Sequence, residues 1–488
     1  MTPFLVILTI AIYFIVLFGI SYLSGRNADS EGFFVGNRKS SWYLVAIAMI
    51  GSSISGVTFV SVPGMVGASS FSYLQMVLGF VVGQFIIAFV LIPLFYKLNV
   101  VSIYEYLENR FGVSSYKTGA WFFFISKMLG ASVRLFLVCI TLQLLVFEPL
   151  NLPFALNAAL TVLLVWLYTF KGGVKTLIWT DAFKTFCLVI SVVLCIYYIA
   201  SDLNLNFSSL VVIIKESSMS KMFFFDDIND KRYFFKQFLA GIFTMIATTG
   251  LDQDMMQRNL SCKNSRDSQK NMITSGISQF FIIALFLMLG VLLYTYASAN
   301  GIALPESSDQ LFPLIATAGY FPIIVGVLFI IGLISAAYAA AGSALTALTT
   351  SFTVDILHDR FKENEVQLTR TRKKVHVSMS IMMTLVIIVI NALNNTSVID
   401  AVYILASYTY GPILGMFAYG IFSKRQIHDR FIPLVAILAP ILCYILQTNS
   451  AAWFNGYEFS YEILIFNALF TAIGFAICSK KVTINKTN

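Results

Sequence analysis

Residues 48–63 read A-M-I-G-S-S-I-S-G-V-T-F-V-S-V-P, inside an apolar segment that begins near Trp42. Six small residues that disfavour a regular membrane helix crowd into eight positions: Gly51, Ser52, Ser53, Ser55, Gly56 and Thr58. In hydrocarbon, backbone groups that leave a helix are tolerated only where they line a cavity or are buried in protein. We interpret the stretch as a spanning helix broken at mid-membrane, whose oxygens bind a small solute or ion. The alternative is an unbroken helix that packs its small residues against a neighbour.

The composition is that of a membrane protein. The chain has 488 residues, of which 58% are hydrophobic and 11% charged, and its mean hydropathy is +0.81. Apolar runs of about 18 residues or more recur along it, which predicts an all-α polytopic membrane protein. The three histidines (His358, His376 and His428) fall in or beside predicted cytoplasmic loops, and no H-E-x-x-H, G-x-S-x-G or C-x-x-C motif occurs. We therefore expect neither an enzyme nor a resident cofactor.

The apolar segments predict thirteen spans: 4–24, 42–64, 72–97, 117–146, 154–170, 179–200, 233–253, 272–298, 321–353, 374–394, 398–422, 430–447 and 459–478. Alternate connections carry nearly all Lys and Arg, among them the one with Arg258, Lys263, Arg266 and Lys270; the 201–232 connection is the main exception. The positive-inside rule then places the N-terminus outside and the C-terminus in the cytoplasm of a plasma (inner) membrane protein. The net charge of +8 reflects this topology and contact with the lipid bilayer, and we expect no nucleic-acid partner.

A weak internal symmetry divides the chain. Two sets of five spans, in 42–200 and 233–422, each open with a broken helix and have a long third helix. The second break is expected at the polar stretch Ala247-Thr248-Thr249-Gly250. Because five is odd, the two sets are inverted in the membrane, and such repeats are typical of transporters that bind their solute near the midplane. An extra N-terminal helix and loop (1–41), an external loop (201–232, a solvated connector rather than a short interfacial helix) and two C-terminal helices with a tail (423–488) complete the expected organisation.

Five motifs carry a resemblance to a known family: F-F-V-G-N-R-K-S-S-W (33–42), Y-E-Y-L-E-N-R-F-G (104–112), G-G-V-K-T-L-I-W-T-D (172–181), D-Q-D-M-M-Q-R (252–258) and F-T-V-D-I (352–356). In this order the sequence resembles the sodium/solute symporters, which include sodium–sugar, sodium–proline, sodium–iodide and sodium–sialate cotransporters. The resemblance runs from about Phe33 to Arg425. It implies a LeuT-type fold of thirteen helices with a 5+5 inverted repeat and an N-terminus outside.

The resemblance also implies an ion site between the first broken helix and the long helix of the second set. The backbone carbonyls that would bind sodium match Gly51, Ile54 and Ala336, and a second sodium in some members would use positions that match Gly342, Ser343 and Asp181. The hydroxyl pair that usually completes the first site is replaced by Ala339 and Ala340. Three alternatives stay open: sodium bound through carbonyls, water and a nearby hydroxyl (Ser335, Ser343 or Thr346), a proton carried on Asp181, or an uncoupled transporter or solute sensor.

Arg134 lies near the middle of the 117–146 span. A charge at that depth costs about 2.5–3.5 kcal/mol on insertion scales, so it should face the interior with a partner. Its guanidinium suits a carboxylate, such as that of a sugar acid, and sialate-carrying relatives have an arginine at the position matching Gly130, one turn earlier. An internal ion pair or a clamp on backbone carbonyls is the alternative. Lys127, two turns before, is expected to extend toward the cytoplasm.

The remaining solute contacts are expected from three places: Ser52, Ser53, Ser55 and Thr58 at the first break, Tyr73 and Gln75 on the next helix, and Thr248 at the second. A sugar-stacking aromatic residue of the sugar carriers is absent at Thr248, which disfavours a neutral hexose. Tyr403, Tyr408 and Tyr410 could supply an aromatic wall or belong to the interfacial belt. We expect a monomeric symporter that imports a small organic solute with sodium as coupling ion, by alternating access.

Overall fold

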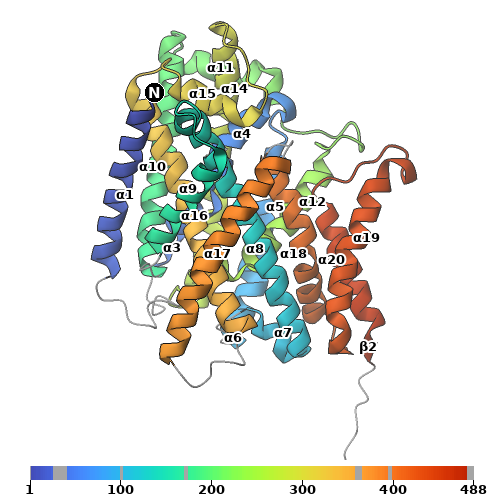
Figure 1. Cartoon of the computed structure of the whole chain (residues 1–488). Helices are drawn as coiled ribbons and strands as arrows, with labels where there is room; N and C mark the ends of the chain where they lie inside the picture. The colour runs from blue at the N-terminus through green and yellow to red at the C-terminus, as the bar shows by residue number, and fades with distance from the viewer. Residues whose placement is uncertain are drawn as a thin grey trace, which may run out of the picture.

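The computed structural model describes residues 2–25, 41–98, 103–169, 174–357, 365–393 and 398–480. The described chain is a bundle of long helices that run between two ends of the molecule (Figure 1). Helix α1 (Pro3–Gly25) starts at the end that carries α4 and α11, while strand β2 (Ser479–Lys480) lies at the opposite end, near α6 and α7. The two ends of the described chain therefore lie on opposite sides of the bundle.

The stretch 48–63 is broken as the sequence predicts. Helix α3 (Trp42–Ser53) ends at Ile54, whose ψ of 96° is extended, and α4 (Gly56–Ser69) starts at Ser55, whose hydroxyl caps the N–H of Thr58. The two arms are bent by 56°. No backbone N–H of the described residues donates to the carbonyls of Gly51 and Ile54, because the last turn of a helix leaves its C=O groups unpaired. The break therefore supplies free backbone oxygens inside the bundle.

A second broken helix follows the loop. Helix α12 (Phe234–Met245) continues through the π-helical turn η5 (Ile246–Gly250), and the chain then bends by 74° before α13 (Gln253–Asn259). The predicted polar stretch 247–250 is therefore still helical, and the break falls just after it, at Leu251 and Asp252. Asp252 is the N-cap of α13 and accepts the N–H of Met255 at 3.1 Å. A carboxylate cap explains why the chain turns here rather than at the threonines.

The other elements complete the bundle: α5 (Tyr73–Ile86) with η2 (Ile87–Leu91) and α6 (Ile92–Leu98), α7 (Glu105–Arg110), α8 (Val113–Leu142) with η3 (Gln143–Phe147), α9 (Phe154–Thr169), α10 (Val174–Asp202), α11 (Phe207–Glu216), η4 (Ser218–Ser220), α14 (Ser265–Ala299), η6 (Ser308–Gln310), α15 (Leu311–Thr317), α16 (Ile323–Ser351) with η7 (Phe352–Ile356), α17 (Glu365–Leu393), α18 (Val398–Phe422), β1 (Gln426–Ile427), η9 (Asp429–Phe431), α19 (Ile432–Trp453) and α20 (Ile463–Ile477). Strand β1 pairs antiparallel with β2.

The helix count agrees with a polytopic membrane protein. Among the described residues, eight helices are long and apolar enough to cross a membrane, or ten if each bent pair is one span, and three shorter apolar helices (Phe4–Gly19, Phe154–Leu167 and Ile463–Ile477) accompany them. The number thirteen stays a prediction, because these three helical stretches are shorter than a full span. The expectation of a mere connector at 201–232 was wrong, since this segment forms the amphipathic helix α11, which buries none of its residues.

The second broken helix is held by a close backbone contact with α5. At Gly241 of α12, a Cβ atom would lie 2.1 Å from the carbonyl oxygen of Met76, and at Gly79 of α5 it would lie 2.2 Å from that of Phe238. Only glycine permits α5 and α12 to approach so closely, as small residues do at membrane helix interfaces. The helices of the two predicted repeats therefore pack directly on one another.

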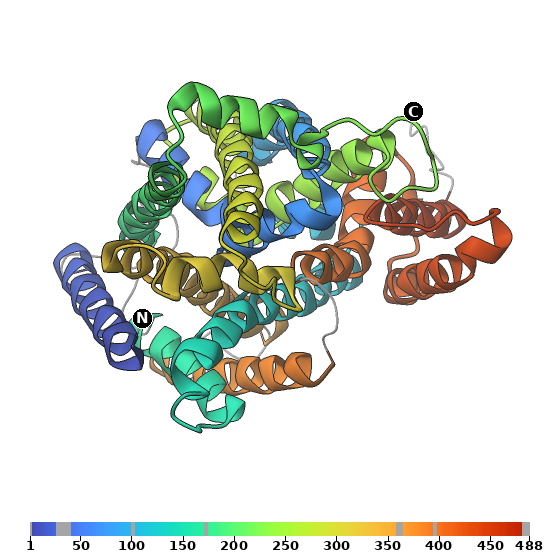
Figure 2. The same ribbon diagram turned by 90° about the horizontal axis from the view of Figure 1, so that it is seen from above.

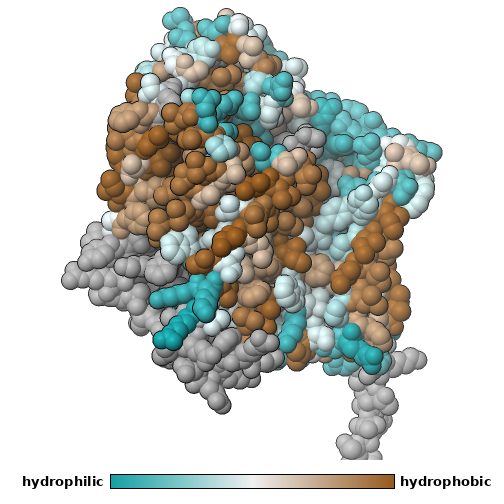
Figure 3. All heavy atoms as spheres, in the orientation of Figure 1, coloured by the Kyte–Doolittle hydropathy of each residue, from teal (hydrophilic) through white to brown (hydrophobic). Residues whose placement is uncertain are grey.

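The outer surface is apolar across the middle of the molecule. Figure 3 shows hydrophobic residues over the middle of one face, with hydrophilic residues gathered at its two ends. Helix α19 is an example, since Leu434, Ile437, Ile441 and Leu442 are each about half exposed (57%, 53%, 48% and 48%). Such a band matches the hydrocarbon layer of a bilayer. In Figure 2, α1 (blue) and the C-terminal helices (red) lie at opposite edges of the bundle, outside the helices that surround the breaks.

Candidate solute and ion site

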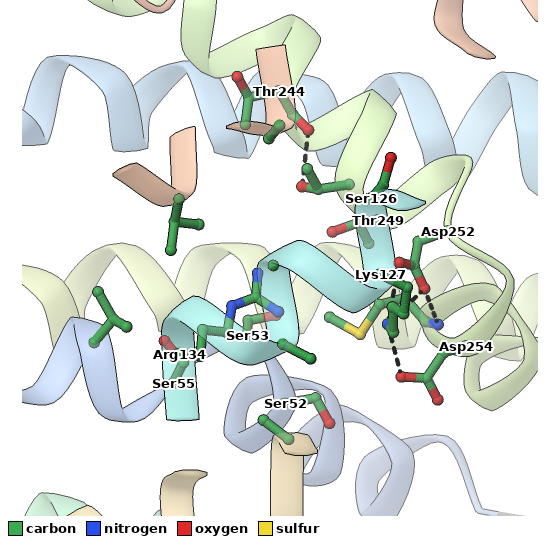
Figure 4. Close-up of a pocket in the computed structure, with 18 of the residues that line it drawn as sticks. Ser52, Ser53, Ser55, Ser126, Lys127, Arg134, Thr244, Thr249, Asp252 and Asp254 are labelled. Carbon is green, nitrogen blue, oxygen red and sulfur yellow. Dashed lines mark hydrogen bonds and ion pairs between the residues drawn. The ribbon is translucent and has the colours of Figure 1, made fainter. Parts of the chain in front are cut away.

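A cavity of about 120 Å³ lies where the two broken helices meet α8, α16 and α18 (Figure 4). Its lining combines hydroxyls, charged groups and apolar side chains: Ser52, Ser53, Ser55, Val57, Thr58, Phe80, Ser126, Lys127, Gly130, Ala131, Arg134, Thr244, Met245, Thr248, Thr249, Asp252, Asp254, Met255, Arg258, Gln279, Ala340, Ser343, Val402, Tyr403, Leu405, Ala406 and Tyr410. A small polar site enclosed between helices at a break is the arrangement expected for a transporter.

The structure brings together many of the residues expected from the sequence. Seven of the predicted site residues line this cavity: Ser52, Ser53, Ser55, Thr58, Arg134, Thr248 and Ser343. Of the others, Gly51, Ile54 and Ala336 are buried beside the break and on α16. Asp181 lies on α10, which packs against α3 and α16, but its side chain is outside the described part of the chain.

Gln75 and Tyr73 are placed differently from the other predicted contacts. The amide of Gln75 bonds the carbonyl of Arg232 at 2.7 Å and accepts the N–H of Phe224 at 3.1 Å, so it fixes the end of the 201–232 segment instead of lining the cavity. The Tyr73 hydroxyl is hydrogen-bonded to the hydroxyl of Tyr403 at 2.6 Å. Tyr403 itself lines the cavity, so Tyr73 supports the wall from behind.

Arg134 is the distinctive group of the cavity. It is partly buried on α8, and among the described residues its guanidinium has no hydrogen bond or ion pair. In Figure 4 its side chain reaches toward the first break, near Ser53 and Ser55, and no dashed line joins it to another residue. Neither the internal ion pair nor the carbonyl clamp considered above is present in this part of the chain. The cavity thus contains one positive charge that the described protein does not neutralise.

Several hydroxyls of the same cavity are also available to a solute. The Thr248 hydroxyl donates to the carbonyl of Thr244 at 2.8 Å, which follows the usual pattern for threonine in a membrane helix. By contrast, the hydroxyls of Ser53, Thr244 and Thr249 have no hydrogen-bond partner among the residues that the structure describes. Together with the guanidinium, they can bind a carboxylate and one or more hydroxyl groups of the same small molecule.

At the end of the cavity nearer the start of α8, four charged residues form a cluster, here called the charge cluster: Lys127, Asp252, Asp254 and Arg258. The ammonium of Lys127 lies 3.1 Å from Asp252 and 3.0 Å from Asp254. Asp252 also accepts the hydroxyl of Tyr410 at 2.7 Å. Two cations and two carboxylates balance, which is how buried charges are tolerated. The prediction that Lys127 extends to the cytoplasm was therefore wrong, because only 8% of its side chain is exposed.

Arg258 connects this cluster to α3 and α16, the two helices between which the ion site is expected. It was expected in a cytoplasmic loop, but it is 4% exposed on α13. Its guanidinium donates to the hydroxyl of Ser52 on α3 and, at 2.5 Å, to that of Ser343 on α16. Ser343 in turn donates to both oxygens of Asp254, at 2.6 and 2.7 Å. The hydroxyl expected to bind an ion is thus already used by two side chains of the protein.

The carbonyl part of the expected ion site remains compatible with sodium. Gly51 and Ile54 have free carbonyl oxygens at the break, and such hard oxygen atoms are suitable ligands for a hard monovalent cation. Ala340 lines the cavity with a methyl group where a hydroxyl would add a ligand. No group of three or more His, Cys, Asp or Glu that could hold a metal ion occurs among the described residues.

His376, which was expected in or beside a loop, is buried on α17 (Glu365–Leu393). It is 8% exposed, and its ring nitrogens are hydrogen-bonded to Thr169 at 3.1 Å and to Thr349 at 2.9 Å. It joins α17 to α9 and α16 and does not line the cavity.

Comparison with known proteins identifies the family. The family model described as the sodium:solute symporter family matches residues 33–429. The chain belongs to the sodium:solute symporter family. It is therefore a multi-pass membrane transporter, and its fold is of the LeuT type.

Relatives of this family member are distant but extend over most of it. It is 24% identical to the sodium/sialic acid symporter NanT of Aliivibrio fischeri over 463 residues, covering 89% of the chain and 86% of the relative. It is 22% identical to the human sodium/iodide cotransporter over 408 residues (82% and 62%), and 25% identical to a zebrafish (Danio rerio) sodium-coupled monocarboxylate transporter over 425 residues (84% and 66%).

Solved structures support the fold of this family member. A sodium-coupled sialic acid symporter in a substrate-bound, outward-open state superposes with a TM-score of 0.80 at 20% identity, covering 98% of this chain and 99% of that one. Mhp1, a nucleobase-cation-symport-1 transporter, superposes with a TM-score of 0.52 at 12% identity, covering 92% and 95%. The break between α3 and α4 therefore belongs to a LeuT-type fold, as the sequence predicts.

Proposed function

We propose that this protein is a secondary active symporter that imports a small organic anion together with sodium. The observation that carries the proposal is Arg134. The charge cluster is neutral by itself, so the described lining has one surplus positive charge, and hydroxyls without a partner among the described residues line the same cavity. A carboxylate would neutralise it through two parallel hydrogen bonds to the planar guanidinium. Carboxylate-bearing sugar acids and hydroxy acids combine the required anion with hydroxyl groups.

The names of the relatives are consistent with an anionic solute. They name sialic acid, iodide and monocarboxylates, which are all anions, and they name sodium as the coupled ion. For this chain, sodium would bind the free carbonyls at Gly51 and Ile54 and the carbonyl of Ala336 across the gap to α16. The sodium ion would enter the cavity together with the solute and be released with it on the cytoplasmic side.

Alternating access follows from the arrangement of the broken helices. The cavity lies between the two predicted repeats, 42–200 and 233–422, so a rocking motion of one against the other would expose it to each side in turn. We propose that the N-terminus faces outside and the C-terminal tail the cytoplasm of a plasma (inner) membrane, in a monomer. The opposite positions of α1 and β2 in Figure 1 support this orientation, as does the basic character of the loops near α7 and β2.

A thermal-shift screen of the purified protein tests the proposal. Glucuronate and glucose are nearly equal in size and differ by a carboxylate, and lactate and N-acetylneuraminate bracket that size. We expect the carboxylates to raise Tm in sodium chloride and to have little effect in choline chloride. Equal stabilisation by glucose and glucuronate would refute the role of Arg134. Stabilisation at low pH without sodium would replace sodium by a proton as the coupling ion.

A further inference from the structure

Between α3 and α16, at the position where a second sodium ion would bind, lies a positively charged side chain of the protein itself, that of Arg258. The guanidinium of Arg258 donates to Ser52 on the last turn of α3 and to Ser343 on α16, from the short arm α13 of the second broken helix. Its Nη2 atom also lies 3.7 Å from Oδ1 of Asp254. Two hydroxyls and a carboxylate are an oxygen set that would otherwise suit a monovalent metal ion.

The two hydroxyls of this set, those of Ser52 and Ser343, each donate their hydrogen to another group of the protein. Ser52 donates its hydrogen to the carbonyl of Ala48 at 3.0 Å, and Ser343 donates its own to Asp254. Each hydroxyl therefore meets Arg258 as an acceptor, the same role that it would have toward a metal ion. A second sodium at Ser343 would have to displace the guanidinium from both hydroxyls.

The charges around this oxygen set also disfavour a second sodium ion. Asp254 is shared between Lys127 at 3.0 Å and Arg258, and Asp252 is held by Lys127 and Tyr410. Among the side chains that the structure describes, an added cation here would find no carboxylate without a cation beside it, and both basic groups would repel it. The free carbonyls of Gly51 and Ile54 lie on the broken helix itself and need no displacement.

We infer that Arg258 acts as a tethered cation which occupies the Ser52–Ser343–Asp254 oxygen set, so that the protein binds a single sodium ion, at the carbonyls of the first break. The inference rests on the proposed function, since it assumes that sodium is the coupled ion. One sodium with one monovalent anion transfers no net charge, so uptake of such a solute should be insensitive to membrane potential. Arg258 is a positioning residue in this scheme, because it holds α13 to α3 and α16 through the oxygens of Ser52 and Ser343.

The test counts sodium ions bound to the detergent-purified protein. Radioactive sodium alone is the probe, measured to saturation at constant ionic strength with choline chloride. We expect one ion per protein and a Hill coefficient near 1 for the wild type and for Arg258→Lys, which keeps the tethered charge. Arg258→Gln leaves the cluster with a net negative charge, and we expect it to bind two ions. Arg134→Gln removes the other guanidinium of the cavity and is the matched control, for which one ion is expected.

The outcomes separate this inference from the function on which it rests. Two ions bound to the wild type would overturn the inference while leaving sodium coupling intact. No bound sodium at all would overturn the proposed function first. A folded Arg258→Gln variant that still binds one ion would show that the tethered charge does not exclude a second. If that variant does not fold, the counts for the wild type and for Arg258→Lys decide the question alone.

Discussion

Replacing Arg134 by glutamine should weaken anion binding and leave the empty protein at least as stable as before. The first effect follows because the surplus charge of the cavity disappears. The second follows because Arg134 has no ion pair or hydrogen bond among the described residues to lose. A contact residue that served only the fold would give the opposite result for stability.

The size of the binding effect can be worked out from the site. Removing one partner of a buried, hydrogen-bonded charge pair costs about 2–5 kcal/mol. Because Arg134 is only partly buried and the cavity offers hydroxyls that still bind the solute, we take the lower part of this range, about 2–4 kcal/mol. At about 1.4 kcal/mol per factor of ten, Kd for glucuronate should rise roughly 30- to 700-fold. The affinity for a neutral sugar should hardly change.

The assay is tryptophan fluorescence or calorimetry for binding, and thermal unfolding of the empty protein for stability. Lys127→Gln is the matched comparison, since it also removes one cation from the same cavity. Lys127, however, is paired with Asp252 and Asp254, so its loss leaves buried carboxylates unbalanced and should destabilise the protein by about 3–5 kcal/mol. Equal loss of stability in the two variants, or an unchanged Kd for glucuronate in Arg134→Gln, would refute the reasoning.

Two further predictions concern packing and the ion. Gly241→Ala would place a methyl group against the carbonyl of Met76, where a Cβ lies at 2.1 Å, and should destabilise the protein by about 3 kcal/mol, whereas Gly19→Ala, with no atom within 4 Å, should be nearly neutral in the same unfolding assay. Equal Tm values would contradict the close contact. Restoring both hydroxyls with Ala339→Ser and Ala340→Ser should raise sodium affinity roughly thirtyfold in a sodium titration, at about 1 kcal/mol per added oxygen ligand; an unchanged affinity would place the ion elsewhere.

The membrane spans and the first break could be predicted from the sequence because both depend on local composition. A long apolar run has few alternatives to a spanning helix, and the glycines and serines at 51–56 weaken the helix where they stand. The second break was predicted a turn too early, since the threonines at 248 and 249 remain helical and the next helix begins only at its N-cap, Asp252. Which residue caps a helix depends on its contacts with other helices, and these contacts cannot be derived from the local sequence.

The charge cluster was missed for a different reason. Arg258 was counted among the basic residues of a cytoplasmic loop, because the predicted span ended at 253. The chain instead turns and continues inside the bundle as α13, which carries Asp254 and Arg258 to the cavity. One observation pointed to this arrangement: Lys127 lies within a span and requires a buried counter-charge. Asp252 and Asp254 supply that counter-charge.

The individual contacts of Gln75 and Tyr403 could not be predicted, because they depend on which face of a helix meets which neighbour. Gln75 turns toward Phe224 and away from the cavity, while Tyr403, which the sequence left between a wall and an interfacial belt, lines it. Hydropathy does not distinguish these faces when the whole helix is apolar.

The central claim is that the cavity at the broken helices carries a carboxylate across the membrane with sodium. The most direct test is uptake of radiolabelled glucuronate and glucose into proteoliposomes under an inward sodium gradient, with choline as the control cation. We expect concentrative uptake of glucuronate that requires sodium and is lost in Arg134→Gln, with no uptake of glucose. Sodium-driven uptake of glucose at a comparable rate, or uptake of glucuronate that does not depend on sodium, would contradict it.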